Sequence, residues 1–321
     1  MGDHRRRQTR CSWLGPVHLH LPQCPGDKRV RRAGGDPQVS HQLHVRRRDG
    51  GDLVGRLYRR RRDGGDQRLY APGETDETST DLVTRFFQGR PFYISHRLGG
   101  DEYPEFTRRG LDASLRAGFK ALELSVRRCG SGEYVLMHDW KTSRTVPGTD
   151  YAIWNTPWAT LKTLQQASGP IMLLDEVLDT IPKDVILAVD HKTTSSKADA
   201  SEGDLQSELD LYEALDAAFG GRPQDRVVWK SFAKGGGARR ARARGFKTMC
   251  MFYETELADA RFEEWDVLGL EWNASQTAWE MLTATGKPTV AHIITNTGQS
   301  STAFSKGARG LMCSRPSDIH P

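Results

Sequence analysis

The chain changes its pattern near residue 85, where apolar runs begin to alternate with amphipathic stretches. The run 184–192 is almost continuously apolar before it ends in charged residues, whereas 209–219 repeats its apolar positions at helical spacing. Near-continuous apolar strands separated by helices are typical of a parallel sheet that is covered on both faces. Eight segments match the strand pattern: 91–96, 120–126, 184–192, 226–232, 246–253, 266–272, 287–296 and 309–314.

Eight strand–helix units predict an α/β fold, a (β/α)8 TIM barrel over residues 85–321, with its active site at the C-terminal ends of the strands. The run 133–139 follows a Gly130–Gly132 turn, which predicts a small hairpin insertion after the second strand. The first helix is expected to begin at Pro104 and Glu105, since both residue types suit a first turn. A doubly wound open sheet is the alternative architecture.

Residues 1–84 lack this alternation and are rich in Arg, Gly, Asp and Pro. Residues 1–80 carry 17 basic against 10 acidic residues, whereas the rest of the chain carries 29 against 31, so the basic balance belongs to this segment alone. The sequence RRRDGGD occurs twice, at Arg46–Asp52 and Arg60–Asp66. We interpret residues 1–84 as a basic, unstructured arm. Binding of nucleic acid or anionic lipid by the arm is the alternative, disfavoured because Asp interrupts the Arg runs.

The five cysteines are odd in number and widely spaced, which predicts free thiols in a reducing compartment rather than a disulfide framework. No apolar run approaches the roughly 18 residues of a membrane span, and no apolar segment of a signal peptide follows the basic N-terminus. We therefore expect a cytoplasmic protein. A true start codon further downstream would leave secretion open.

Charged side chains gather at the ends of two predicted strands. Glu123 and Ser125 alternate onto one face, which Arg127 joins if the strand continues, and Asp190 and Lys192 share a face by the same rule. One carboxylate from each strand predicts a site for a divalent cation that prefers oxygen ligands, Ca²⁺ or Mg²⁺. The alternative for Glu123 is an ion pair at the strand end, with Lys192 as its partner.

Histidines end the first strand and the hairpin run. Because imidazole titrates near neutrality, His96 and His138 could share general acid and general base duties in phosphoryl transfer. Arg97 adds a guanidinium group that can bind a phosphate through two parallel hydrogen bonds. His292 and His191 are weaker candidates, and the strand alternation turns His191 toward the helix layer.

Taken in order, these motifs resemble the glycerophosphodiester phosphodiesterase family, one of the phosphatidylinositol-phospholipase-C-like phosphodiesterase barrels. The resemblance extends from about Phe92 to Ser317, nearly the whole predicted barrel. Each motif alone is weak, and their shared order makes the resemblance specific. The matching motifs are His96-Arg97-Leu98-Gly99-Gly100, Pro104-Glu105-Phe106-Thr107, Glu123-Leu124-Ser125, His138-Asp139, Arg144-Thr145, Asp190-His191-Lys192, Ser231-Phe232 and Cys313-Ser314-Arg315-Pro316.

The resemblance implies metal-assisted hydrolysis of a glycerol phosphodiester, or of a lipid-derived one, to an alcohol and glycerol phosphate. In the family a free glycerol hydroxyl can attack first, which gives a cyclic phosphate that water then opens. The implied roles are acid and base for His96 and His138, phosphate neutralisation for Arg97 and Lys192, and Ca²⁺ or Mg²⁺ ligation for Glu123 and Asp190.

Two positions depart from the family pattern. Ser125 stands where the family has a metal-binding aspartate, and Asp190 stands where it has a glutamate. Fewer ligand charges weaken cation binding, and related bacterial phospholipases C use a cationic side chain in place of the metal, a role open to Arg127. A non-catalytic barrel that binds phosphodiesters or lipids therefore stays open, as does a sphingomyelinase-D-like lipid lyase. Among the tryptophans, Trp272 at a strand end is the best placed to contact a substrate.

Overall fold

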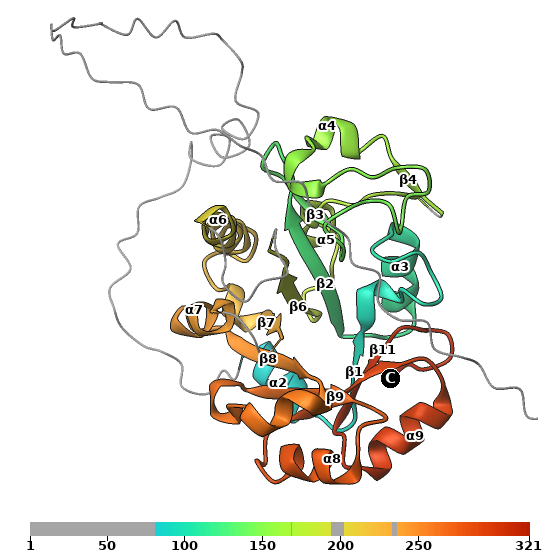
Figure 1. Cartoon of the computed structure of the whole chain (residues 1–321), viewed down its shortest axis with the longest axis vertical. Helices are drawn as coiled ribbons and strands as arrows, with labels where there is room; N and C mark the ends of the chain where they lie inside the picture. The colour runs from blue at the N-terminus through green and yellow to red at the C-terminus, as the bar shows by residue number, and fades with distance from the viewer. Residues whose placement is uncertain (1–80, 168, 194–201, 233–235) are drawn as a thin grey trace, which may run out of the picture. The chain divides into compact units, whose positions relative to one another are not determined.

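The computed structural model of the chain describes residues 81–167, 169–193, 202–232 and 236–321 (Figure 1). The arm predicted for residues 1–84 lies outside this part of the chain, apart from its last four residues. Three of those four belong to a helix, α2 (Leu82–Gln88), and the fourth, Asp81, caps it by accepting a hydrogen bond from the backbone N–H of Thr84 at 2.6 Å. Residues 82–84, which the sequence pattern places in the arm, are therefore helical.

Eight parallel strands close into a barrel. In the order in which they pair they are β1 (Phe92–Ser95), β2 (Ala121–Arg128), β6 (Ile186–His191), β7 (Val227–Ser231), β8 (Lys247–Phe252), β9 (Val267–Glu271), β10 (Thr289–Ile294) and β11 (Gly310–Cys313). β11 pairs with β1, with Leu311 opposite Tyr93, and this pairing closes the ring. The predicted (β/α)8 barrel and its eight strands are confirmed, and the open doubly wound sheet is excluded.

The predicted hairpin insertion is also confirmed. The strand β3 (Tyr134–Leu136) runs antiparallel to β2, with Leu136 opposite Val126. Between β3 and β6 lie five short elements: η2 (Ile153–Asn155), α4 (Trp158–Leu161), β4 (Gln165–Gln166), β5 (Gly169–Pro170) and α5 (Leu174–Leu178). This insertion has a small apolar core of its own, formed by Cys129, Val135, Met137, Val146, Ile153, Leu161 and Ile171.

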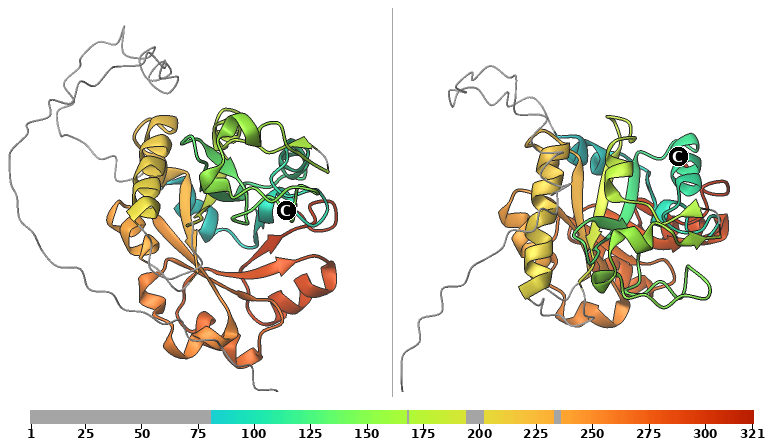
Figure 2. Two further views of the ribbon diagram at one scale, coloured as in Figure 1. Left: turned by 45° about the horizontal axis from the view of Figure 1, so that its top comes forward. Right: turned by 90° about the horizontal axis from the view of Figure 1, so that it is seen from above.

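Helices cover the outside of the barrel (Figure 2). They are α3 (Arg108–Arg116) after β1, α6 (Glu202–Ala218) after β6, α7 (Gly237–Ala243) after β7, α8 (Gln276–Thr283) after β9 and α9 (Thr297–Ser305) after β10. Two 3-10 turns, Glu254–Asp259 and Phe262–Glu264, connect β8 to β9. No helix in the described part of the chain is long and apolar enough to cross a membrane.

Two apolar clusters distinguish the strand side chains that point into the barrel from those that point out toward the helices. Leu122 and Leu124 of β2 pack in the large cluster that the strands share with the outer helices. Ala121 belongs to a smaller cluster inside the barrel, which α2 closes at the N-terminal end. Because successive side chains of a strand alternate, Glu123 points into the barrel, and the same alternation in β6 turns Asp190 inward. The interior is thus apolar at one end and charged at the other, where TIM barrels carry their active sites.

The first barrel helix begins later than the sequence predicts. α3 starts at Arg108, because the hydroxyl of Thr107 accepts a hydrogen bond from the backbone N–H of Gly110 at 3.4 Å and caps the helix. The prediction that Pro104 and Glu105 form its first turn is therefore wrong. Both residues lie in the turn before the helix, and Glu105 is buried there.

Candidate active site

His96 and Arg97 follow β1 in one 3-10 turn, η1 (His96–Leu98), at the C-terminal end of the barrel. Arg97 has a φ of 49°, a left-handed conformation that costs a residue with a side chain roughly 1–2 kcal/mol. Glu123 holds this turn, since its Oε2 accepts a hydrogen bond from the backbone N–H of Arg97 at 2.9 Å. Ser314 holds the buried His96 ring through a 2.7 Å hydrogen bond between Oγ and Nδ1. Glu123 of β2 and Ser314 directly after β11 thus fix both residues.

His138 reaches the site from the hairpin, two residues after β3. Its Nδ1 lies 2.7 Å from Oδ1 of Asp139, whose other oxygen accepts a hydrogen bond from Arg144. Burial would raise the pKa of Asp139, but the hydrogen bonds from Arg144 and His138 hold it down to about 2. An ionised Asp139 keeps the His138 proton on Nδ1 and leaves Nε2 as the atom that can exchange a proton.

Both imidazoles are neutral near pH 7. Burial lowers the pKa of His96 well below its ordinary value, and the positive charge of Arg97 lowers it further. Burial also lowers the pKa of His138, with help from the charges of Lys192 and Arg97. A positive charge on His138 would lower the pKa of His96 further.

Glu105 is the buried anion that joins the two halves of the site. Its Oε2 accepts a hydrogen bond from Nη1 of Arg97 at 3.0 Å, and its Oε1 accepts one from Nη2 of Arg144 at 2.6 Å. Because Arg144 also binds Asp139, an unbroken series of charged hydrogen bonds runs from Arg97 to His138. Sequence reasoning missed this role of Glu105, although the residue belongs to one of the family motifs.

The two predicted metal ligands, Glu123 and Asp190, come together, but a lysine lies between them. Lys230 of β7 donates hydrogen bonds from Nζ to Oε1 of Glu123 at 3.1 Å and to Oδ2 of Asp190 at 2.7 Å. The Nζ atom of Lys192 lies 2.8 Å from the same Asp190 oxygen. Burial would raise the pKa of Asp190, but the two ammonium groups hold it well below its usual range. Glu123 therefore forms an ion pair, as the alternative predicts, but its partner is Lys230, whereas Lys192 pairs with Asp190.

Lys230 was not among the predicted site residues, although the sequence held a signal for it. Val228 belongs to the cluster inside the barrel, so alternation along β7 turns Lys230 inward as well. A charge buried within an otherwise apolar strand must be paired. Phe232 packs against both cations, since its ring centroid lies 5.4 Å from Nζ of Lys230 and 5.6 Å from Nζ of Lys192.

Arg127 and Trp272 do not have the roles that the sequence suggests, a replacement for the metal and a substrate contact. Arg127 donates from Nε and Nη2 to the backbone carbonyl of His138 and from Nη1 to that of Thr193. Arg127 therefore ties the hairpin to the end of β6, and burial lowers its pKa to about 10. Trp272 packs against the large cluster between strands and helices, which gives no support to a substrate contact.

The described side chains do not fit a divalent cation at this place. Glu123 and Asp190 each bind the Lys230 ammonium group. Ser125, opposite Asp190 in the strand register, offers a hydroxyl where a third carboxylate is expected, and its buried Oγ has no hydrogen-bond partner among the described residues. No three or more His, Cys, Asp or Glu side chains in that part of the chain are arranged to hold a metal ion. Ca²⁺ or Mg²⁺ stays a prediction that this arrangement disfavours.

The two weaker histidine candidates lie on opposite sides of the strand layer. His292 of β10 is buried inside the barrel, with Nε2 3.2 Å from the backbone carbonyl of Phe252, and burial lowers its pKa to about 4. His191 points outward to α6, where its Nε2 lies 3.0 Å from Oγ of Ser207, as the alternation of β6 predicts.

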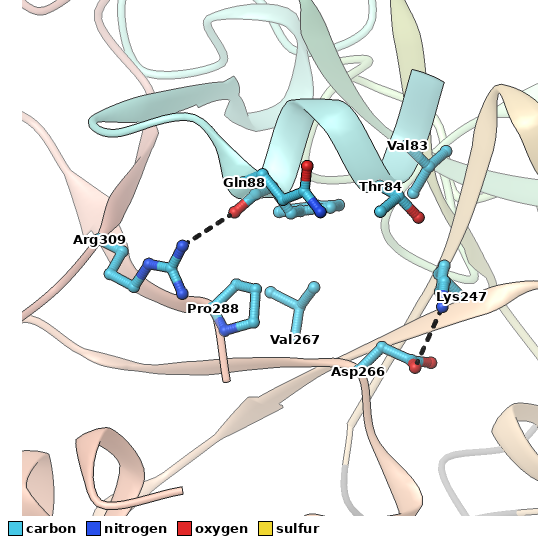
Figure 3. A pocket seen from close by; sticks show the side chains of 9 residues that line it. Val83, Thr84, Gln88, Lys247, Asp266, Val267, Pro288 and Arg309 are labelled. Carbon is cyan, nitrogen blue, oxygen red and sulfur yellow. Dashed lines mark hydrogen bonds and ion pairs between the residues drawn. The ribbon is translucent and has the colours of Figure 1, made fainter. Parts of the chain in front are cut away.

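A cavity lies at the other end of the barrel, beneath α2 (Figure 3). Three of its charged residues stand at or just before the start of a strand: Lys247, Asp266 and Arg309. The residues that line it are Val83, Thr84, Phe87, Gln88, Lys247, Asp266, Val267, Pro288 and Arg309. None of the candidate catalytic residues is among them, so this cavity is separate from the candidate active site.

The central part of the barrel matches a known family of enzymes. Residues 96–236 match the model of the "Glycerophosphoryl diester phosphodiesterase family". Over these residues the chain is similar to that family. The matched segment contains both histidines, and it also contains Glu123, Asp190, Lys192 and Lys230.

Solved structures share the barrel fold. A putative glycerophosphoryl diester phosphodiesterase from Agrobacterium tumefaciens superposes with a TM-score of 0.59 and 18% identity, over 71% of this chain and 95% of that one. A phosphodiesterase from Oleispira antarctica, solved in complex with the product sn-glycerol-3-phosphate, gives a TM-score of 0.59 and 21% identity, over 74% of this chain and 96% of that one.

One curated relative is protein YqiK of Bacillus subtilis, which is uncharacterized. It is 24% identical over 148 residues, which make up 43% of this chain and 57% of that protein. The chain therefore spans little more than half the length of the curated relative that it matches.

Proposed function

We propose that the chain hydrolyses a glycerophosphodiester, or a lipid-derived phosphodiester, to an alcohol and glycerol phosphate. The observation that carries this proposal is the pair of neutral imidazoles at the strand ends. A hydrogen bond holds Nδ1 of His96 and of His138, while neither Nε2 has a partner within the described residues. One ring can then accept a proton as the base, and the other can donate one once the bound diester has favoured its protonation. The family to which residues 96–236 are similar supports the same chemistry.

In the proposed first step, a free glycerol hydroxyl attacks the phosphorus atom. One histidine takes the hydroxyl proton as the new P–O bond forms, and the other protonates the alcohol oxygen as its bond to phosphorus breaks. Water then opens the cyclic phosphate with the histidines in exchanged roles, so both rings return to their starting state. The negative charge of the bound diester offsets the lowered pKa values and favours protonation of the ring that acts as the acid.

Arg97 and Lys192 are the cations proposed to neutralise the phosphate. Glu105 orients Arg97 and Asp190 orients Lys192. Both cations remain partly open to solvent, with 20% of the Arg97 side chain and 13% of the Lys192 side chain exposed. Donors fixed before the substrate arrives stabilise the charge that develops on the phosphoryl oxygens during the reaction.

Members of this family generally use a divalent metal, and the sequence predicts Ca²⁺ or Mg²⁺ with Glu123 and Asp190 as ligands. Because the residues present do not fit such an ion, no step of the proposed reaction involves a metal. The two carboxylates act by orientation instead: Glu123 binds the backbone of Arg97, and Asp190 binds two ammonium groups.

We also propose a reducing compartment such as the cytoplasm. Cys129, Cys250 and Cys313 are buried free thiols, and burial raises the pKa of Cys250 and of Cys313. Buried thiols of this kind are unreactive residues of the core. They support the proposal because no disulfide joins them.

Hydrolysis of glycerophosphocholine by the full chain tests the proposed reaction. His96→Ala and His138→Ala should each lower kcat by about 10²–10⁴-fold. His320→Ala, at an exposed histidine near the C-terminus, is the matched control and should leave kcat unchanged. Activity that survives both catalytic substitutions would refute the two-histidine mechanism. Phosphate-competitive ligand binding without turnover of any diester would favour a non-catalytic binding barrel.

A further inference from the structure

Lys230 occupies the place that a divalent cation would need. Its Nζ lies 3.1 Å from Oε1 of Glu123 and 2.7 Å from Oδ2 of Asp190, and Lys230 is only 5% exposed. Calcium and magnesium lie roughly 2.0–2.6 Å from the carboxylate oxygens that bind them. A cation that bridged these two oxygens would therefore collide with the ammonium group.

The charge at this place is already balanced. Glu123 and Asp190 supply two negative charges, while Lys230 and Lys192 supply two positive charges within hydrogen-bond distance of them. A divalent cation would add two further positive charges beside two ammonium groups in a buried setting, where like charges repel strongly. The set therefore lacks the excess negative charge that attracts a divalent cation.

The third position that a cation would use is also altered. Ser125 lies opposite Asp190 in the pairing of β2 with β6, and its side chain is a neutral hydroxyl. A lysine ammonium group has three N–H donors. Two N–H groups of the Lys230 ammonium bind Glu123 and Asp190, and the third N–H group can bind an oxygen of a phosphodiester.

We infer that the Lys230 ammonium group takes the place of the divalent cation in this site, so that the chain acts on its phosphodiester without a metal. The sequence suggested Arg127 for such a role, but Arg127 is bound to the backbone carbonyls of His138 and Thr193. The catalytic half of this inference rests on the proposed function, whereas the exclusion of a cation rests on the contacts of Lys230 alone.

Cation binding by the full chain, after dialysis against a chelator, tests the exclusion directly. Isothermal titration with Ca²⁺, Mg²⁺ and Mn²⁺ should detect no binding that depends on Glu123, and millimolar cation should leave the thermal midpoint unchanged. Hydrolysis should be insensitive to EDTA. Binding by the wild type that disappears in Glu123→Gln would overturn the inference, whether or not the chain hydrolyses any diester.

A double variant tests whether a cation can bind once Lys230 is removed. Lys230→Met combined with Ser125→Asp removes the ammonium group and restores a third carboxylate, so its thermal midpoint should rise with added cation. Lys120→Met combined with Ser125→Asp is the matched control, because Lys120 pairs with Asp184 at the surface, and its midpoint should not respond. A folded Lys230→Met/Ser125→Asp chain that binds no cation would also overturn the inference. If that variant does not fold, the wild-type titration decides.

The two proposals can fail separately. Hydrolysis that requires added cation would keep the proposed reaction and overturn the replacement by Lys230. A chain that binds no cation and turns over no diester would keep the exclusion of the metal and refute the reaction.

Discussion

Replacing His292 with glutamine should make the fold less sensitive to acid. His292 is 8% exposed and lies inside the barrel, where burial lowers its pKa from an ordinary value of 6.5 to about 4. The nearby charge of Lys230 acts in the same direction, while the hydrogen bond to the Phe252 carbonyl opposes it. Between these pKa values the unfolded chain binds a proton that the folded chain does not. The free energy of unfolding therefore falls as the pH drops through this interval.

The size of the effect follows from the two pKa values. A pKa that drops from 6.5 in the unfolded chain to about 4 in the folded chain corresponds to about 3 kcal/mol of unfolding free energy. This contribution is fully present above pH 6.5 and is lost as the pH falls toward the pKa of the folded chain. Glutamine has no proton to gain in this range, and its amide can still donate to the Phe252 carbonyl. On acidification, the free energy of unfolding of His292→Gln should therefore fall by up to about 3 kcal/mol less than that of the wild type.

Urea unfolding of the full chain, followed by tryptophan fluorescence from about pH 7.5 to about pH 4.5, measures this difference. Other acid-sensitive groups are common to both proteins and cancel in the comparison. His320→Gln, at an exposed site, is the matched control and should follow the wild type at every pH. Parallel curves for the wild type and His292→Gln would refute the reasoning, because they would show that His292 does not titrate differently on folding.

Two further substitutions test the link between the histidines. Glu105→Gln should destabilise the fold by about 3 kcal/mol and lower kcat, because it leaves Arg97 and Arg144 without their shared buried anion; urea unfolding and turnover check both effects, and unchanged values would contradict the role of Glu105. Arg127→Met should lower kcat with little change in KM, because Arg127 orients His138 through its backbone carbonyl. Arg127→Lys should restore part of the loss, and an increase confined to KM would contradict this positioning role.

The strands could be predicted from the sequence because the pattern of apolar residues that specifies each strand lies within the strand itself. Near-continuous apolar runs such as 184–192 specify a strand buried on both faces, and alternation along it settles that Asp190 points inward. The same rule brought Glu123 to the same side of the barrel. These predictions needed only the period of the pattern, not a knowledge of the partners.

The contacts inside the site could not be predicted in this way, because they join distant residues. Lys230 binds Glu123 across 107 positions of the chain and Asp190 across 40. Alternation gives the face of a side chain but not its reach: Arg127 lies on the predicted face, yet its guanidinium group binds carbonyl oxygens beyond the strand. The helix start expected at Pro104 and Glu105 failed for a local reason instead, because the hydroxyl of Thr107 caps α3 and the helix begins at Arg108.

Among the described residues, the hydrogen bonds and ion pairs around the two neutral histidines form a network of five cations and four carboxylates. Its cations are Arg97, Arg127, Arg144, Lys192 and Lys230, and its carboxylates are Glu105, Glu123, Asp139 and Asp190. A phosphodiester carries a single negative charge and would neutralise this excess, whereas a phosphate monoester carries about −1.5 to −2 at pH 7. Because uncompensated charge is costly in a buried site, the network favours a diester over a monoester. Under the proposed reaction, the second charge that appears on glycerol phosphate would promote its release.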